Sequence, residues 1–225
     1  MLFATRFMEL YFIFLTDIIN NNYLCYLNKK FNQVKGYDMA FMSEDQLRAM
    51  GFKSLGSNIK ISEKASFYNC DQLEIGDNSR IDDFCVVSGK IKIGRNVHVA
   101  VFCNLAGGEE GIELHDFSGL AYGCQVFAQS DDYSGMTMTN PTVPKIYKNE
   151  IKKEIIIGRH VIVGTNSLIF PGVHLQEGCA IGAMTLVRKS TEPWFIYSGN
   201  PAIKIKSRNK NLLNLEHEYL KNEEK

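Results

Sequence analysis

The sequence predicts a mainly β protein folded as a parallel β-helix, in which three short strands make each turn of a coil. Three observations support this prediction. Aliphatic residues recur every six positions, small residues follow four positions after them, and the pattern returns to the same phase after 18 residues, as from Ile75 to Ile93. An antiparallel sandwich would instead alternate within strands of about five or six residues, with turns about every 8 to 12 residues.

The aliphatic row supplies the core of the predicted coil. One turn alone cannot bury its apolar residues, so successive turns must stack to form a continuous interior. The small residues, among them Cys85, Cys103 and Cys124, are expected where the chain turns a corner inside that interior. The aliphatic positions are Ile75, Ile81, Val87, Ile93, Val99, Leu105, Leu114, Leu120, Val126, Ile157, Val163, Ile169, Leu175, Ile181 and Val187.

Two interruptions of the repeat predict features outside the coil. Ile93 and Leu114 are 21 residues apart, and the excess over a full turn lies in the glycine-rich segment 106–111. Val126 and Ile157 are 31 residues apart, which predicts an excursion loop at about residues 130–153. Insertions into a solenoid fall on one side and often build the binding face, so we expect this loop to contribute to function.

The remaining segments flank the coil, which we expect over residues 61–190. Residues 39–60 read as a lead-in with a short helix at 43–51, capped by Ser43 and ended by Gly51. Residues 191–225 read as a turn followed by a short helix at 207–221. Residues 1–38 form an N-terminal extension, which we interpret as lying upstream of a start at Met39; the alternatives are an authentic extra helix and a weak membrane-surface helix. Its longest clean apolar run, 10–15, is far too short to span a bilayer.

Composition excludes several classes of function. Lys plus Arg and Asp plus Glu each number 25, so net charge favours no nucleic-acid partner. No two of the six cysteines form a CxxC pair, which argues against a zinc or dithiol redox site. We therefore expect buried, reduced thiols, no metal and a cytoplasmic protein.

Two stretches carry a resemblance to a known family. Together with the repeat, IGAMTLVRKSTEPWFIYSGNPA resembles the coenzyme A-using hexapeptide-repeat acyltransferases, and SDDYSGMTMTNPTVP resembles acetyltransferases of cell-surface polysaccharides. Over residues 39–208 the chain is similar to the sugar O-acetyltransferase branch, which includes galactoside and maltose acetyltransferases and O-antigen and capsule acetyltransferases. The resemblance implies a left-handed coil, a homotrimer with active sites between subunits, acetyl-CoA as cosubstrate, and a role in lipopolysaccharide or capsule biosynthesis.

The resemblance predicts transfer of acetyl to a sugar hydroxyl. The alternative is N-acetylation of a nucleotide-linked amino sugar, such as a dTDP-4-amino-4,6-dideoxy sugar, and only the acceptor pocket separates the two. A β-helix hydratase would need three histidines converging on zinc, and the histidine spacing here does not provide them. A non-catalytic scaffold would have no need of the coenzyme A-type tail.

Acetyl transfer needs a base that takes the acceptor's proton, and histidine suits this role near neutral pH. We expect His98 to be that base, since Val97 to Ala100 is similar to a motif of nucleotide-sugar N-acetyltransferases in which histidine lies at the acetyl group. His115 is the second candidate. Asp131 is the third, because the best-known relatives carry their base near that point of the loop. His160, His174 and His217 read as surface residues.

The resemblance also implies binding residues. Carboxylates accept hydrogen bonds from sugar hydroxyls, and an aromatic ring can stack on a sugar face. The expected acceptor-binding residues are Asp82, Asp83, Asp131, Asp132 and Tyr133. Thr165, Ala183 and Lys189 match family positions along the pantetheine arm and adenine of coenzyme A, and Lys206 matches a basic position near its 3′-phosphate.

Overall fold

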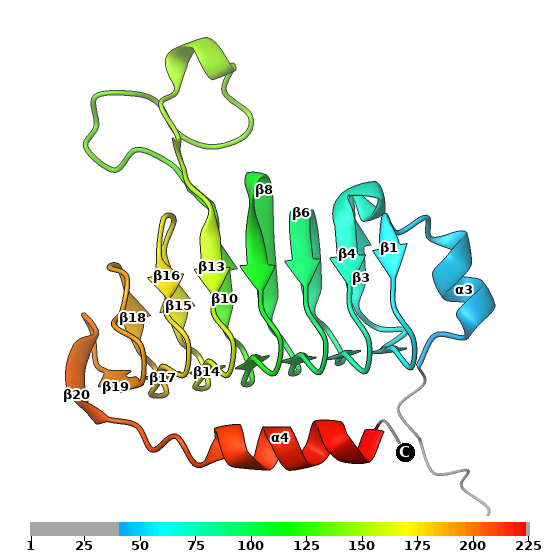
Figure 1. The fold of residues 1–225 in the computed structure, drawn as a ribbon. Helices are drawn as coiled ribbons and strands as arrows, with labels where there is room; N and C mark the ends of the chain where they lie inside the picture. The colour runs from blue at the N-terminus through cyan, green and yellow to red at the C-terminus, as the bar shows by residue number, and fades with distance from the viewer. Residues whose placement is uncertain (1–40, 224–225) are drawn as a thin grey trace, which may run out of the picture. The chain divides into compact units, whose positions relative to one another are not determined.

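The computed structural model of the protein describes residues 41–223. The N-terminal extension 1–38 and the start predicted at Met39 lie outside these residues. The described chain is the parallel β-helix that the repeat predicts, with the excursion loop at one corner and a helix at another (Figure 1). No helix within it is long and apolar enough to cross a bilayer.

The coil has three strand faces, which we call A, B and C. Face A contains β1 (Ser54–Leu55), β4 (Leu73–Ile75), the ends of β6 (Val86–Ile93) and β8 (Asn104–Leu114), β13 (Ile155–Ile157) and β16 (His174–Leu175). Face B contains β3 (Ser66–Tyr68), the beginnings of β6 and β8, β10 (Gln125–Phe127), β15 (Leu168–Ile169) and β18 (Leu186–Val187). Face C contains β2 (Lys60–Ile61), β5 (Arg80–Ile81), β7 (His98–Val99), β9 (Gly119–Leu120), β14 (Ile162–Val163), β17 (Ala180–Ile181) and β19 (Phe195–Ser198).

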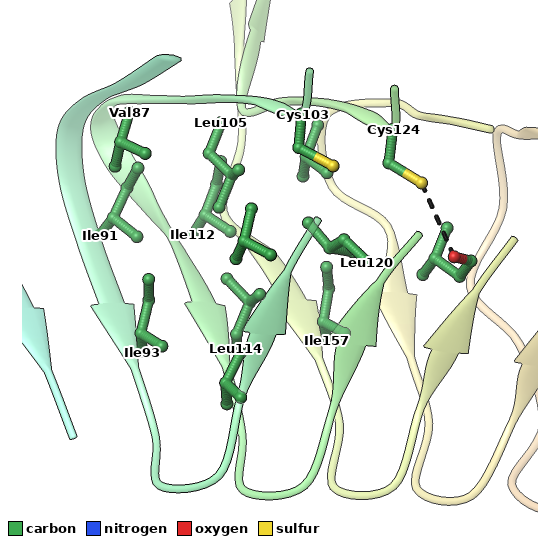
Figure 2. Close-up of a cluster of buried hydrophobic side chains, with 14 of the residues drawn as sticks. Val87, Ile91, Ile93, Cys103, Leu105, Ile112, Leu114, Leu120, Cys124 and Ile157 are labelled. Carbon is green, nitrogen blue, oxygen red and sulfur yellow. Dashed lines mark hydrogen bonds between the residues drawn. The ribbon is translucent and has the colours of Figure 1, made fainter. Parts of the chain in front are cut away.

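The core is the stacked aliphatic row of the repeat (Figure 2). Parallel pairing places Leu105 beside Val87 in one neighbouring turn and beside Val126 in the other. All three side chains are at most 1% exposed. Since every second strand residue points inward, the intervening residues of each face project to the outside of the coil.

The small residues at the corner between faces C and B include cysteines whose thiols are buried between stacked turns. Cys85 donates its S–H to the carbonyl of Ala100 at 3.0 Å, and Cys103 does the same to Ala121 at 3.1 Å. A larger side chain at either position would have to displace the turn stacked against it. These cysteines therefore have a packing role, and both are free thiols, as expected.

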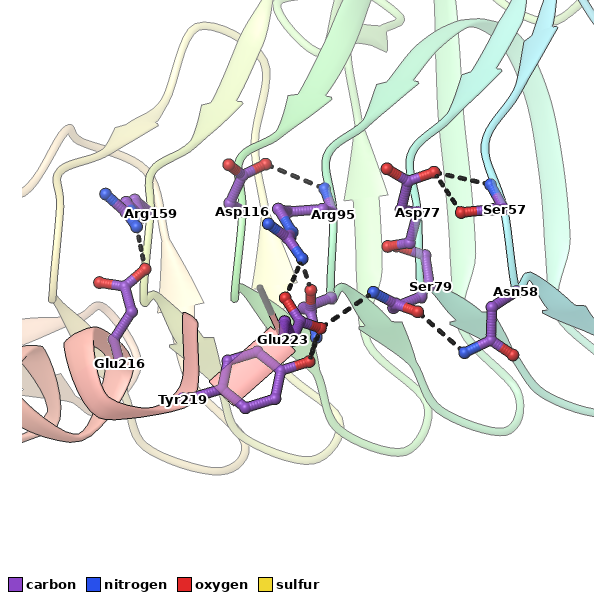
Figure 3. Close-up of polar contacts among 12 residues, drawn as sticks. Ser57, Asn58, Asp77, Ser79, Arg95, Asp116, Arg159, Glu216, Tyr219 and Glu223 are labelled. Atoms are coloured by element: carbon purple, nitrogen blue, oxygen red, sulfur yellow. Dashed lines mark hydrogen bonds and ion pairs between the residues drawn. The ribbon is translucent and has the colours of Figure 1, made fainter. Parts of the chain in front are cut away.

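The corner between faces A and C turns through left-handed backbone. Asn58, Asn78 and Asn96 have φ of 51°, 57° and 55°, a region that asparagine adopts more readily than most residues. Aspartates tie neighbouring turns together beside this corner (Figure 3): Asp77 accepts from the Ser57 amide at 2.6 Å. Asp116 accepts from the Arg95 amide at 2.9 Å in the same way.

Short elements complete the two ends of the coil. Helix α3 (Glu44–Ala49) begins at a capping box, in which the Ser43 hydroxyl accepts from the Gln46 amide and the Gln46 side chain accepts from the Ser43 amide. The 3-10 turn η1 (Cys70–Gln72) precedes β4. At the other end, β20 (Ile203–Ser207) returns antiparallel to β19, which explains why helix α4 (Leu212–Glu223) begins five residues later than the predicted residue 207.

Helix α4 packs along the corner between faces A and C (Figures 1 and 3). The Glu216 carboxylate accepts from Arg159 and, at 2.9 Å, from Nε2 of His160. Arg95 of the coil pairs with Glu223 near the end of the helix at 2.5 Å. The prediction that His160 is a surface residue is wrong: it is 8% exposed, because α4 covers the turn in which it lies.

The excursion loop leaves the coil after β10 and rejoins it at β13. Its stem is an antiparallel pair, β11 (Gln129–Ser130) with β12 (Ile151–Lys152), and the 3-10 turn η2 (Lys145–Tyr147) lies within it. It departs at the corner between faces B and A, where the glycine-rich segment of β8 also lies. Figure 1 shows it rising from the coil on the side opposite α4. Both sequence interruptions therefore lie at one corner.

Candidate active site

His98 and Asp82 form a hydrogen-bonded pair on face C. His98 begins β7, and Asp82 directly follows β5 one turn earlier. Nε2 of His98 lies 2.8 Å from one oxygen of Asp82, and Nε of Arg80 donates to the other at 2.6 Å. An ionised carboxylate can only accept, so Nε2 carries the hydrogen; in the neutral imidazole, Nδ1 then keeps its lone pair. The geometry is that of an imidazole oriented by a buried carboxylate.

Asp82 and Asp83 both form hydrogen bonds with other side chains of the protein. The Asp82 side chain is only 6% exposed and offers little surface to a sugar. Asp83 accepts from the Ser62 hydroxyl at 2.5 Å and from Lys64 at 2.7 Å, and the Lys64 hydrogen bond is the main reason that the pKa of Asp83 lies below its ordinary value. The structure thus brings Asp82 to His98 but places neither aspartate beside the excursion loop.

A cavity of about 410 Å³ lies where the excursion loop meets face B, and we call it the loop cavity. Its floor is the outer surface of the coil, formed by Phe127, Leu168 and Phe170. Its wall comes from the loop and its stem. The lining residues are Phe127, Gln129, Ser130, Asp131, Tyr133, Pro141, Glu150, Leu168, Phe170 and Pro171.

Asp131, Asp132 and Tyr133 also line a second cavity of about 610 Å³ within the loop itself. Tyr133 is 90% exposed, so its ring is available to a ligand. Asp132 has a different role, since its carboxylate accepts from the amide and hydroxyl of Ser134 and from the Thr137 hydroxyl. The amide hydrogen bond is the main cause that lowers the pKa of Asp132. Of the predicted loop residues, Asp131 and Tyr133 face the loop cavity, and Asp132 shapes the turn.

Glu150 is a site residue that the sequence pattern did not reveal. It lines the loop cavity and accepts from Lys148, whose side chain is only 7% exposed, at 2.8 Å. Lys152 lies 3.6 Å from its second oxygen. The Lys148 hydrogen bond is the main reason that the pKa of Glu150 lies below its ordinary value, so the carboxylate is ionised at neutral pH. The loop cavity therefore presents two carboxylates.

A third cavity, of about 630 Å³, lies past the end of face B, and we call it the C-terminal cavity. Arg188, Lys189 and Lys204 give its lining three basic side chains. Lys204 pairs with Glu192 at 2.7 Å and lies 3.5 Å from the centre of the Phe195 ring. Lys189 lines this cavity, whereas Lys206 does not. A bulge between Ile196 and Tyr197 changes the register of β20, so Lys204 takes the position beside the cavity.

Face B connects the loop cavity with the C-terminal cavity. Strands β10, β15 and β18 are consecutive neighbours, which places the two cavities only a few strand spacings of about 4.8 Å apart. Thr165 and Ala183 lie in neighbouring turns at the edge of this face, since the amide that follows Ala183 donates to the Thr165 carbonyl at 2.7 Å. A long, flexible arm could follow this surface from one cavity to the other.

His115 lies away from these cavities. It follows β8 on face A and lines a separate polar groove of about 280 Å³ with Lys92 and Arg159. Nε2 of His115 lies 3.3 Å from Glu113. His98 also lines neither cavity, because face C is a different side of the coil. Within residues 41–223, no three His, Cys, Asp or Glu residues gather into a possible metal site.

Strand alternation was the signal that could have found the cavity floor. Phe127 follows the buried Val126, and Phe170 follows the buried Ile169, so both must face outward on neighbouring strands. Both also lie at the corner from which the loop departs. Glu150 and Lys148 carried no such signal, because the loop has no repeat and its fold brings them to the coil.

Comparison with known proteins gives relatives that span the coil and the loop. No family model matches the sequence. The chain is 44% identical over 181 residues to a dTDP-4-amino-4,6-dideoxy-D-glucose acyltransferase of Escherichia coli, covering 79% of this chain and 94% of that protein. It is 33% identical over 137 residues to a probable macrolide acetyltransferase of Lysinibacillus sphaericus, covering 60% of this chain and 62% of that protein.

Solved structures extend this similarity to the fold. AntD, an N-acyltransferase from Bacillus cereus solved with dTDP and 3-hydroxybutyryl-CoA, has a TM-score of 0.81 and 45% identity, covering 82% of this chain and 98% of its own. A mutant of AntD solved with dTDP-4-amino-4,6-dideoxyglucose and coenzyme A has a TM-score of 0.81 and 46% identity, covering 81% of this chain and 98% of its own.

Proposed function

We propose an activity for this chain because it belongs to the hexapeptide-repeat β-helix acyltransferases, together with AntD and its Escherichia coli relative. It transfers an acyl group from an acyl-coenzyme A to the amino group of a dTDP-linked 4-amino-4,6-dideoxy sugar. This is the alternative activity considered for the sequence, and it replaces acetylation of a sugar hydroxyl as the favoured hypothesis. The proposed acyl donors include acyl groups larger than acetyl, since AntD was solved with 3-hydroxybutyryl-CoA.

The loop cavity is the observation that carries this proposal. Its carboxylates, Asp131 and Glu150, are hydrogen-bond acceptors when ionised, so they suit a ligand rich in N–H and O–H donors. An amino sugar has such donors, whereas the thioester group has none. The floor of the cavity continues along face B toward the three basic residues of the C-terminal cavity, which suit the phosphates of coenzyme A.

The reaction forms one bond and breaks another. The amine nitrogen of the sugar attacks the thioester carbonyl carbon, and the C–N bond forms as the C–S bond breaks. A base takes the proton that the nitrogen loses, and the coenzyme A sulfur finally receives a proton as the thiol leaves. The products are an amide on the sugar and free coenzyme A.

His98 is our proposed base, with Asp82 as the residue that positions it. The Asp82 carboxylate holds Nε2–H at 2.8 Å and leaves the lone pair of Nδ1 for the acceptor. His98 lies on face C, so it can reach the loop cavity only if a neighbouring subunit brings its own cavity there. Asp131 is the competing candidate because it lies in the cavity of the same chain. His115 faces another groove and is no longer favoured.

In the proposed homotrimer, a neighbouring subunit covers the exposed surface at the corner between faces C and B. Phe84, Phe102, Tyr122 and Met184 lie at this corner and are 50%, 60%, 60% and 74% exposed. The rings of Phe84 and Phe102 stack with their centres 5.2 Å apart. A row of exposed apolar side chains is typical of a surface that another subunit covers. Phe102→Asp should release monomers, detectable by light scattering, while Tyr68→Asp at a site outside the row should not.

The proposed binding of coenzyme A has a matched test. Lys189→Met and Lys204→Met should each raise KM for acyl-CoA by about 3- to 30-fold, because each removes one charged contact to phosphate. Lys206→Met lies outside the C-terminal cavity and serves as the control. An effect of Lys206→Met equal to that of Lys204→Met would restore the original prediction for Lys206.

The decisive experiment compares an amine with a hydroxyl at the same carbon. Release of coenzyme A thiol is measured with acetyl-CoA and with 3-hydroxybutyryl-CoA, using dTDP-4-amino-4,6-dideoxyglucose and its 4-hydroxy counterpart as acceptors. We expect turnover with the amine, a product with the mass of an amide, and turnover at least about 100-fold slower with the hydroxyl. Faster transfer to the hydroxyl would overturn the proposed N-acylation in favour of O-acylation.

A further inference from the structure

The loop cavity has two chemically different sides. One side consists of coil residues without polar side-chain atoms, namely Phe127, Leu168 and Phe170, with Pro171 beside them. The other side carries Asp131 and Glu150. A ligand that fills the cavity must therefore be apolar on one edge and rich in hydrogen-bond donors on the other.

The apolar side is part of the coil and cannot easily rearrange. Leu168 lies in β15, where it pairs with Gln125 of β10 and Leu186 of β18. Phe170 follows β15, and its amide donates to the Val187 carbonyl at 3.1 Å. A polar ligand atom placed against these side chains would lose its contact with water and find no protein partner there, which costs free energy.

The polar side selects the sugar over the thioester as the occupant. Glu150 is held by Lys148 at 2.8 Å and by Lys152 at 3.6 Å, so it stays in place as an acceptor. Within residues 41–223, the Asp131 carboxylate accepts one weak hydrogen bond, from the Asn140 amide at 3.4 Å, and retains lone pairs for a ligand. The thioester group itself offers these oxygens no donor, whereas the amine and ring hydroxyls of an amino sugar do.

Ordinary hexoses carry hydroxyls around the whole ring, including the one on C6. A 6-deoxy sugar instead ends in a methyl group, which gives it one apolar edge. We propose that the apolar floor formed by Phe127, Leu168 and Phe170 receives the C6 methyl of the acceptor and selects 6-deoxy sugars against their 6-hydroxy counterparts. This inference rests on the proposed function and assigns the residues that determine its specificity.

The first test uses the unmodified enzyme with two acceptors that differ in one atom. They are dTDP-4-amino-4,6-dideoxyglucose and dTDP-4-amino-4-deoxyglucose, which has a hydroxyl on C6. We expect kcat/KM to be about 10- to 100-fold higher for the 6-deoxy acceptor, the range by which an apolar pocket rejects an added hydroxyl. N-acylation of both with kcat/KM within about 2-fold would overturn the inference and leave the proposed function intact. Turnover of neither acceptor would overturn both.

The second test assigns the selectivity to the apolar floor. Leu168→Gln keeps the size of the side chain and offers the C6 hydroxyl a hydrogen-bond partner. Phe170→Gln offers such a partner from the other end of the floor, with a smaller side chain. We expect at least one of them to reduce the selectivity at least 5-fold, chiefly by raising kcat/KM for the 6-hydroxy acceptor. Leu168→Met is the matched apolar control and should keep the ratio within about 2-fold of the unmodified enzyme. An unchanged ratio in both glutamine variants would overturn the assignment.

Discussion

Replacement of His98 is the sharpest test of the proposed chemistry. His98→Ala should reduce kcat by about 10²- to 10⁴-fold, or about 3 to 5 kcal/mol in activation free energy, which is the usual contribution of a positioned base. The fold should tolerate the change, because the His98 side chain is 52% exposed. Asp82 keeps its contact with Arg80 at 2.6 Å, so the variant leaves no buried carboxylate without a partner.

The assay is steady-state release of coenzyme A thiol with the amino-sugar acceptor, together with thermal unfolding of each variant. His115→Ala is the matched control, since His115 lies in a groove on face A, and its kcat should stay within about 2-fold. Asp131→Asn tests the competitor within the loop cavity. A His98→Ala enzyme that retains kcat within about 3-fold of the unmodified enzyme, while Asp131→Asn loses at least about 10²-fold, would refute our choice of base and assign it to Asp131.

Three further predictions concern the scaffold that holds the site. Glu216→Ala should lower the free energy of unfolding by about 2 to 3 kcal/mol in urea titrations, because His160 and Arg159 lose their shared carboxylate partner. Glu218→Ala, at an exposed position of the same helix, is the control and should change the free energy of unfolding by under about 0.5 kcal/mol. Equal effects of the two substitutions would contradict the role of α4 in covering the coil. Leu105→Ala should lower the free energy of unfolding by about 3 to 5 kcal/mol, because the stacked turns on both sides prevent the cavity left by the substitution from closing. A loss of under about 1 kcal/mol would contradict this packing. Hydrogen bonds from Ser134 hold the pKa of Asp132 below its ordinary value of about 3.8. The protection of the Ser134 amide against hydrogen exchange should therefore persist as pH falls to about 3.8, and disappear only as pH falls through the lower pKa of the folded state. Loss of protection already near pH 5 would contradict this role of Asp132.

The six-residue repeat is sufficient to predict most of the scaffold. A period of six requires three strands per turn, and an aliphatic residue in every strand requires that turns stack. The same count locates the excursion loop, since any residues beyond a whole number of turns must leave the coil. The outward position of Phe127 and Phe170 also follows from strand alternation, although alternation alone does not show that these residues line a cavity.

The errors have specific physical causes. His160 occupies a corner position that would be exposed in an isolated coil, but α4 returns from the far end of the chain and buries it. Lys206, expected near the 3′-phosphate of coenzyme A, does not line the C-terminal cavity; Lys204 lines it instead, because a bulge in the β19–β20 pair sets Lys204 opposite Tyr197. Neither the docking of a distant helix nor a bulge is encoded in a local pattern.

By itself, the sequence determined a stacked three-sided coil, its buried rows, the place of its loop and the choice of a candidate histidine. These properties depend on residues within one or two turns of each other, so a period in the sequence specifies them. The tertiary structure alone decided that Asp82 holds His98, that Lys148 presents Glu150 to the loop cavity, and that an apolar floor faces two carboxylates. Those contacts depend on how an aperiodic loop folds back on the coil and on how far each side chain reaches, and neither follows a repeat.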